Sequence, residues 1–207
     1  MNDFGRAAFR NVADVSRETE ELLEAYSHLL AKWTSKINLV APNTLQALWT
    51  RHFLDSMQLW NMAPKAGRWV DLGSGGGFPG LVIAILGRQM PTPPVTLVES
   101  DQRKAAFLRT VIRELKLPAA VIADRIEDIE PLRADVLTAR ALAPLGKLLE
   151  YTARHRETGG VSLFPKGERA DDEIGAALDR WRFECQKLKS ETDEKSTILK
   201  IGTVTRV

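Results

Sequence analysis

Hydrophobic residues recur at two different spacings, and the change of spacing divides the chain near residue 66. Before that point the period is helical, and Ser16 can cap a helix whose apolar face holds Leu22, Tyr26 and Trp33. The pattern at 44–62 predicts another helix, followed by a Pro- and Gly-containing linker at 64–67. We therefore expect residues 1–66 to form a helical extension that packs on the rest of the chain.

Beyond the linker, short apolar strands alternate with helices. The pattern predicts strands at 68–72, 95–99, 119–123, 135–139 and 161–164, with helices at 80–86, 103–115 and 145–153. Such alternation indicates parallel βαβ units with right-handed crossovers. Two last strands, 181–188 and 197–207, suggest an antiparallel hairpin. Residues 67–207 thus predict an α/β domain with a Rossmann-like, mostly parallel seven-stranded sheet.

Composition narrows the class of protein further. The chain has 207 residues, a formal net charge of +2 and one cysteine, Cys185, which excludes an internal disulfide and a cysteine-cluster zinc site. The first residues lack the apolar core of a signal peptide, and the longest apolar run, 81–86, is too short to cross a bilayer. We expect a cytoplasmic protein with no membrane partner and no metal site. The mild positive charge permits a nucleic-acid partner without requiring one.

The segment from Asp71 to Gly80, DLGSGGGFPG, carries the strongest chemical signal. Glycines are needed where a backbone turns sharply and a ligand lies against it. The following helix start offers free N–H groups at the carboxyl edge of the sheet, where α/β proteins bind ligands. A carboxylate at Asp71 would suit a cationic ligand such as the methionine ammonium of S-adenosylmethionine.

The same segment contains a literal GxGxxG pattern, Gly75 to Gly80, which alone is weak evidence for NAD. The match begins three residues after the strand end, and Asp71 would repel a pyrophosphate. We therefore favour S-adenosylmethionine. A dinucleotide- or nucleotide-binding Rossmann module remains an alternative, as does a methyltransferase that acts on a small molecule or a protein.

Two later strand ends supply further candidate ligand contacts. Glu99 closes the second strand, a position from which an acidic side chain commonly binds ribose hydroxyls. The turn at 124–127 follows the third strand and can place an apolar side chain and backbone groups against adenine. Asp124 could equally cap a helix there.

These segments resemble the bacterial 16S ribosomal RNA guanine-N7 methyltransferase G family, also known as glucose-inhibited division protein B. The resemblance covers roughly residues 20–170. It rests on 71–80, on Glu99-Ser100 with Arg103-Lys104, on Thr138-Ala139-Arg140-Ala141, on the segments INLV (37–40) and RHFLDS (51–56), and on Phe164-Pro165-Lys166-Gly167. Such families often have Met where this chain has Pro165. The resemblance implies a class I methyltransferase fold and methyl transfer to N7 of one guanine in 16S ribosomal RNA or the small ribosomal subunit. Together with the strand-end argument, it implies cofactor contacts at Asp71, Gly73, Phe78, Glu99, Ile126, Glu127 and Arg140.

The implied reaction needs little catalytic machinery. Guanine N7 carries a lone pair and no proton, so we expect orientation of the reactants rather than a general base. Arg140 and Lys166 are candidates for gripping phosphate, because a contact at N7 itself would block the reaction. His52 and Asn38 could help form an RNA-facing rim, while His52 could equally be a partly buried helix residue. Arg103, Lys104, Arg109 and Arg113 could be a basic RNA-facing stripe or an ordinary solvated helix face. We expect a monomer.

Overall fold

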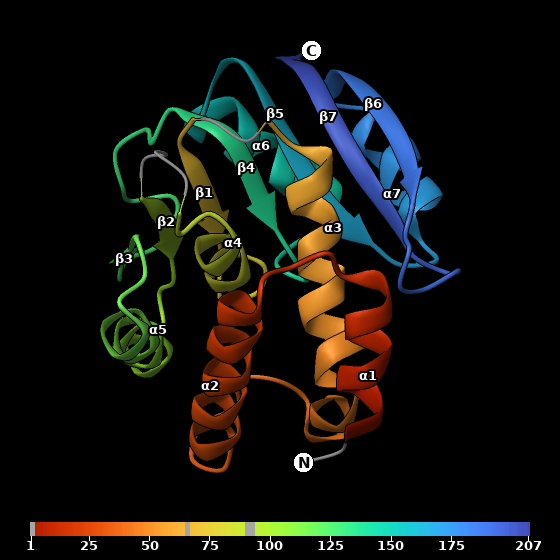
Figure 1. The fold of residues 1–207 in the computed structure, drawn as a ribbon. Helices are drawn as coiled ribbons and strands as arrows, with labels where there is room; N and C mark the ends of the chain where they lie inside the picture. The colour runs from red at the N-terminus through yellow and green to blue at the C-terminus, as the bar shows by residue number, and fades with distance from the viewer. Residues whose placement is uncertain (1–2, 65–66, 90–93) are drawn as a thin grey trace.

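The computed structural model describes residues 3–64, 67–89 and 94–207. Its centre is a seven-stranded sheet, in strand order β3-β2-β1-β4-β5-β7-β6 within the described residues. The strands are β1 (Trp69–Leu72), β2 (Val95–Val98), β3 (Ala119–Ile122), β4 (Ala134–Ala139), β5 (Arg156–Lys166), β6 (Trp181–Lys189) and β7 (Thr197–Arg206). All neighbouring pairs from β3 to β5 are parallel, whereas β7 is antiparallel to both β5 and β6. The predicted fold, including its C-terminal hairpin, is confirmed (Figure 1).

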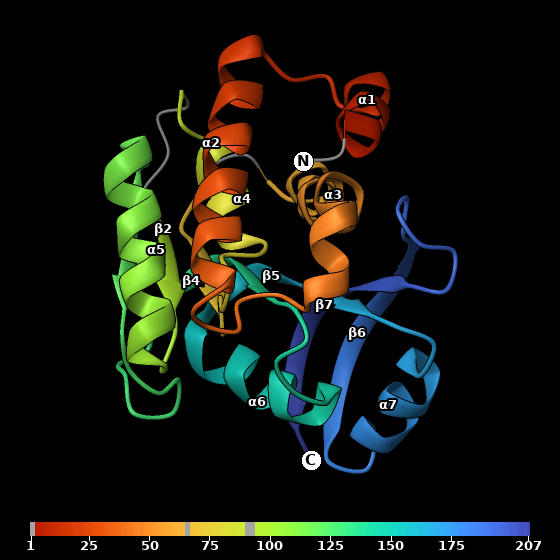
Figure 2. The ribbon, with the colours of Figure 1, turned by 90° about the horizontal axis from the view of Figure 1, so that it is seen from below.

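Helices cover both faces of the sheet (Figure 2). One face packs against α4 (Gly80–Leu86), α5 (Gln102–Leu115) and the N-terminal helices, and the other against α6 (Leu145–His155), with α7 (Ala170–Ala177) beside α6. The apolar spacing of α5 explains its placement, since Phe107, Leu108 and Val111 are fully buried. Asp101 caps this helix by accepting hydrogen bonds from the N–H groups of Arg103 and Lys104.

The N-terminal region contains α1 (Asp3–Val12), α2 (Arg17–Thr34) and a third helical stretch. Ser16 caps α2 as predicted, and its hydroxyl accepts a hydrogen bond from the Thr19 N–H. The single helix predicted over 44–62 is wrong in detail. The chain there forms a 3₁₀-helix η1 (Pro42–Ala47), a π-helical stretch η2 (Trp49–Leu54) and α3 (Asp55–Met62). The wider π turn presents His52, Phe53 and Leu54 together as buried residues.

The N-terminal helices share one hydrophobic core with the sheet. Leu23, Tyr26 and Leu30 of α2 are completely buried in the same cluster as Leu81 of α4 and Phe107 of α5. The proposed division at residue 66 stays a prediction, because residues 65 and 66 of the expected linker lie outside the described residues, as do 90–93 of the loop before β2. In the described part of the chain, no helix combines the length and apolar character that crossing a bilayer requires.

Candidate functional site

Two adjoining cavities lie at the carboxyl ends of the parallel strands. The smaller, about 290 Å³, is bounded by the glycine-rich loop after β1, by Glu99 after β2, and by residues 124–127 after β3. The larger, about 1200 Å³, lies between the η2–α3 stretch, the end of β5 and the turn between β6 and β7. Ala141 and Leu142, which follow β4, line both cavities.

The glycine-rich loop needs glycine for two different reasons. Gly73 and Gly75 have φ of +65° and +54°, a left-handed conformation that side chains rarely adopt. A Cβ on Gly75 would find only the Gly73 carbonyl oxygen within 4 Å, at 3.8 Å, so this glycine keeps the smaller cavity open. Gly77, at φ +94°, instead faces the protein, where a Cβ would collide with Leu81 and with the Tyr26 hydroxyl. The Tyr26 hydroxyl donates a hydrogen bond to the Gly76 carbonyl, so helix α2 holds the loop from behind.

The side chain of Asp71 does not face a cavity, although the sequence predicts a carboxylate that faces a ligand. Its side chain is completely buried and is not among the residues that line either cavity. One oxygen accepts a hydrogen bond from the Thr138 hydroxyl at 2.8 Å, and the other from the Gly80 N–H at 3.2 Å. Burial raises the pKa of Asp71 from its ordinary 3.8 to about 6. The structure therefore places Asp71 as a tie between β1, β4 and the start of α4, and any contact with a bound ligand stays a prediction.

Glu99, Ile126 and Glu127 all line the smaller cavity, as their predicted role requires. The Glu99 carboxylate accepts hydrogen bonds from the N–H groups of Gly75 and Asp101, both at 2.8 Å, which fixes its orientation. Glu127 accepts a 2.6 Å hydrogen bond from the Tyr151 hydroxyl, and this bond holds the pKa of Glu127 below its usual value.

The backbone of Ile126 is held from inside the protein by a buried histidine. His155 Nε2 donates to the Ile126 carbonyl at 2.9 Å. Burial lowers the pKa of His155, so the imidazole is neutral and keeps this donor. The 124–127 turn is thus tied to α6 through His155 and Tyr151. Asp124 does not cap a helix, since this segment forms only a turn.

Phe78, His52 and Arg140 form one stacked group beside the larger cavity. The rings of His52 and Phe78 stack at a centroid distance of 4.8 Å, and the Arg140 guanidinium lies over the Phe78 ring at 5.0 Å. Phe78 is buried against His52 and Arg140 and lines neither cavity, and its contact with a bound cofactor stays a prediction. The glycine loop is thereby joined to the RHFLDS segment that precedes α3.

Arg140 is held in place by three hydrogen bonds to that segment. Its guanidinium donates to the Asp55 carboxylate at 3.2 Å, to the Arg51 carbonyl at 3.4 Å and to His52 Nδ1 at 2.8 Å. Arginine can only donate, so His52 Nδ1 is the acceptor and the proton of the neutral ring is on Nε2. Burial, then the charges of Arg140 and Arg51, lower the pKa of His52 to about 3. His52 is therefore neutral at physiological pH, and the lone pair of its Nδ1 already accepts the Arg140 hydrogen bond, so the ring is a poor base.

Lys166 lines the larger cavity, but its ammonium already has protein partners. It donates to the Ala143 carbonyl at 2.8 Å and pairs with Glu173 at 2.7 Å. Glu173 also accepts a 2.7 Å hydrogen bond from the Leu145 N–H. These contacts anchor the far end of the 140–145 segment, while Arg140 anchors its near end. Leu142, between the anchors, packs on Gly73, where an added Cβ would lie 2.5 Å from Leu142 Cδ1.

Comparison with known proteins identifies the family. Residues 19–198 match the family model described as rRNA small subunit methyltransferase G. The Ribosomal RNA small subunit methyltransferase G of Ruegeria pomeroyi is 48% identical over 95% of this chain and 97% of its own length. That of Paramagnetospirillum magneticum is 50% identical over 93% of this chain and 92% of its own. The chain belongs to the rRNA small subunit methyltransferase G family.

Solved structures agree with this family assignment at the level of the fold. An O-methyltransferase from Bacillus cereus in complex with SAH superposes with a TM-score of 0.60 at 14% identity, covering 98% of both chains. A SAM-dependent methyltransferase from Aquifex aeolicus gives 0.60 at 12% identity over 84% of this chain and 97% of its own. The class I methyltransferase fold is confirmed. Membership of the rRNA small subunit methyltransferase G family rules out the two alternatives that the residues alone left open, a nucleotide-binding module and a methyltransferase that acts on a small molecule or a protein.

The sequence did not predict the role of several residues at the site of this methyltransferase G family member. Tyr26, Asp55, Tyr151 and Glu173 each hold a predicted residue or its loop in place. Asp55 had a signal, because it lies in the RHFLDS segment of the resemblance; the others looked like ordinary helix residues. Asn38, by contrast, is exposed in the segment between α2 and η1, and it does not line either cavity.

Proposed function

We propose that this protein transfers a methyl group from S-adenosylmethionine to N7 of a guanine in 16S ribosomal RNA. Family membership supports an RNA methyltransferase that uses this cofactor. The observation that carries the proposal is the meeting of the two cavities at Ala141 and Leu142. A donor in the smaller cavity and a base in the larger one would be separated only by this short segment at the end of β4.

The smaller cavity fits the adenosyl part of the cofactor. Gly75 leaves it open, Glu99 offers a fixed carboxylate for ribose hydroxyls, and Ile126 offers an apolar side chain for the adenine. Gly73 and Glu127 also line this cavity, and Arg140, which lines the larger one, completes the proposed binding set. The buried Asp71 and Phe78, near the two ends of segment 71–80, would act by holding the loop in place. When bound, S-adenosylmethionine supplies a methyl carbon made electrophilic by its positively charged sulfur.

The residues of the larger cavity suit orientation rather than proton transfer. Guanine N7 needs no base, and the neutral His52, whose Nδ1 is occupied by Arg140, agrees with that requirement. Positioning two reactants in a reactive geometry can supply about 7–11 kcal/mol of the barrier reduction. Arg140 and Lys166, which line the larger cavity, would fix the base or its phosphates there, and Asn38 would belong to the outer rim.

A labelling experiment tests the function. The purified protein and S-adenosylmethionine carrying a labelled methyl group are incubated in three separate reactions, which contain small ribosomal subunits, protein-free 16S RNA or total protein as the methyl acceptor. Subunits from cells that lack the enzyme provide unmodified substrate. We expect label in RNA, and mass spectrometry of a nuclease digest should identify 7-methylguanosine. Label only in protein would overturn the RNA assignment, and a different methylated nucleoside would overturn the N7 assignment.

We also propose that the protein acts as a monomer in the cytoplasm. Both cavities are formed within one chain, so the reaction requires no second copy, and a monomer suffices. An enzyme acting on small-subunit RNA would work in the cytoplasm. Light scattering of the purified protein would test the monomer directly.

A further inference from the structure

Positive charge is concentrated on one surface outside the two cavities. The last turn of α2 with the two residues that follow it, and helix α5 with its two ends, carry seven Lys and Arg side chains and only two acidic ones, Asp101 and Glu114. The whole chain has a formal net charge of only +2, so the remainder of the protein is on balance acidic. We define the α2–α5 basic patch by its outward cations Lys32, Lys36, Arg109, Arg113 and Lys116, all of which are exposed.

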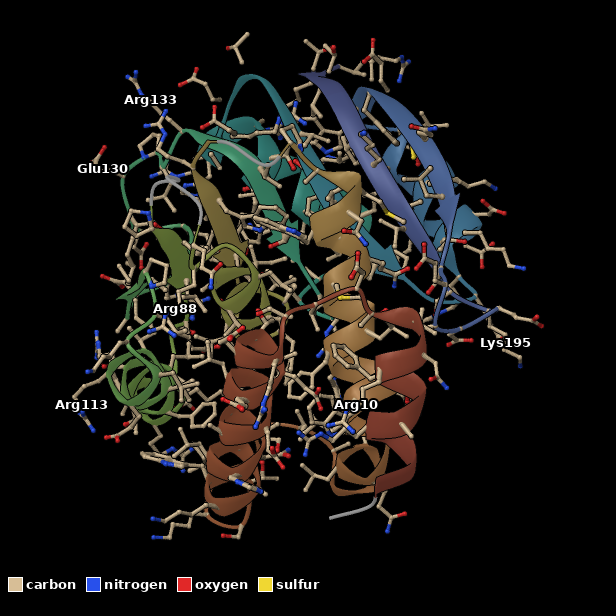
Figure 3. The ribbon with its side chains drawn as sticks, in the orientation of Figure 1. Arg10, Arg88, Arg113, Glu130, Arg133 and Lys195 are labelled. Atoms are coloured by element: carbon tan, nitrogen blue, oxygen red, sulfur yellow. The ribbon has the colours of Figure 1, made fainter. Side chains whose placement is uncertain are left out.

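The patch is shaped as a cleft rather than as a flat helix face. A cavity of about 500 Å³ separates α2 from α5 and is lined by Lys32, Lys36 and Arg113, with the half-buried Trp33 between the lysines. The Trp33 ring packs on Phe107 of α5 at 5.7 Å, which fixes the spacing of the two helices. Arg113 extends away from the body of the protein into solvent (Figure 3).

Most of these cations have no acidic partner within the protein. Arg113 pairs with its neighbour Glu114 at 3.0 Å. In the part of the chain that the structure describes, no carboxylate lies within 4.0 Å of Lys32, Lys36, Arg109 or Lys116. Unpaired cations gathered on one surface repel one another, and that repulsion is relieved when they bind a polyanion.

The patch also continues toward the reaction site. Lys104, on the first turn of α5, lines the smaller cavity, so one helix connects that cavity to Arg109 and Arg113. A nucleic acid whose target base entered the larger cavity could pass the adjoining smaller cavity and extend along this helix. Its phosphates would then reach the cleft between α2 and α5.

We propose that the α2–α5 basic patch binds the phosphate backbone of the same RNA that is methylated, outside the target nucleotide. This inference rests on the proposed function. The contact is electrostatic and does not depend on the RNA sequence, because the patch presents charges and one aromatic side chain, whereas sequence is read through specific contacts to base edges. It contributes to substrate affinity and leaves the transfer step unchanged.

The test is a charge reversal with a matched control. The variant Lys32→Glu/Lys36→Glu alters two exposed side chains that line neither of the two cavities at the strand ends. The control Arg180→Glu/Arg182→Glu makes the same change in net charge at the start of β6, which is at the opposite end of the sheet (Figure 1). Three quantities are measured for each protein: the Kd for S-adenosylhomocysteine, the KM and kcat with small subunits, and the Kd for protein-free 16S RNA as a function of salt.

We expect the patch variant to raise KM and the RNA Kd at least 10-fold at low salt, with kcat and the S-adenosylhomocysteine Kd within 2-fold of the wild type. Loss of two phosphate contacts should reduce the slope of log K against log salt by about 1.4, using the single-strand value of about 0.7 per contact. The control should change none of these quantities by more than 2-fold.

Unchanged KM and salt slope, or an equal change in the control, would overturn the proposal and leave the patch an ordinary solvated face. A raised KM with subunits but an unchanged Kd for protein-free RNA would also overturn it, since the partner would then be a ribosomal protein. If the wild type methylates no RNA, the proposed function itself fails. The two failures are therefore distinguishable.

Discussion

The hydrogen bond from Tyr26 to the glycine-rich loop leads to the sharpest prediction. Tyr26 is completely buried in α2, and its hydroxyl donates to the carbonyl of Gly76, which is also buried. Tyr26→Phe removes this donor alone. The ring would keep its contacts with Phe53 and Phe78, at centroid distances of 5.5 and 5.4 Å.

The cost follows from leaving a buried carbonyl without this donor. A buried polar group that loses its partner costs about 1–3 kcal/mol, more than the net value of a typical hydrogen bond. We expect the free energy of unfolding to fall by about that amount. Part of the loss should appear as disorder of the loop, so the Kd for S-adenosylhomocysteine should rise roughly 3- to 10-fold, where tenfold corresponds to about 1.4 kcal/mol.

Urea denaturation and calorimetric titration with S-adenosylhomocysteine measure the two effects separately. The matched control is Ile201→Val, a completely buried residue of β7 away from the loop, which should lose about 0.5–1.5 kcal/mol without a change in Kd. A Tyr26→Phe protein that loses stability but binds S-adenosylhomocysteine as tightly as the wild type would refute the idea that α2 orders the cofactor loop.

Three other perturbations test the site geometry. Gly73→Ala should destabilise the protein by roughly 1–2 kcal/mol because of the left-handed backbone at this position, and further because the new Cβ clashes with Leu142. Adding Leu142→Ala should recover the part due to the clash but not the part due to the backbone, and thermal denaturation of the single and double variants would show this. Arg140→Gln should raise the pKa of His52 from about 3, because a nearby positive charge is lost, and NMR titration of the imidazole would detect it; an unmoved pKa would contradict the observed contact. Burial raises the pKa of Asp71 above its unfolded value, so the folded protein favours the protonated carboxyl. The contribution of this carboxyl to the free energy of unfolding is fully present below pH 3.8 and is lost as the pH rises through about 6. Asp71→Asn should therefore flatten that part of the stability curve, worth at most about 3 kcal/mol, when urea midpoints are measured from pH 4 to 7.5; an unchanged slope would place the titration elsewhere.

The sequence by itself determined the elements and the kind of ligand site. Alternating strands and helices gave the parallel sheet, because periodicity and turn chemistry act over a few residues. The glycines after β1, Glu99 after β2 and the 124–127 turn were identified for the same local reason. The sequence did not predict the π-helical break in 44–62, since this break depends on the packing of Phe53 and Leu54 against distant helices.

Only the tertiary structure decided how the side chains of the site meet. Arg140 and Asp55 are 85 residues apart, and Tyr26 and Gly76 are 50 apart, yet both pairs are in contact. The same packing turned Asp71 inward, where Thr138 and Gly80 satisfy its oxygens. Which of several polar side chains faces a cavity depends on long-range packing and on competition for hydrogen-bond partners, and neither leaves a local pattern in the chain.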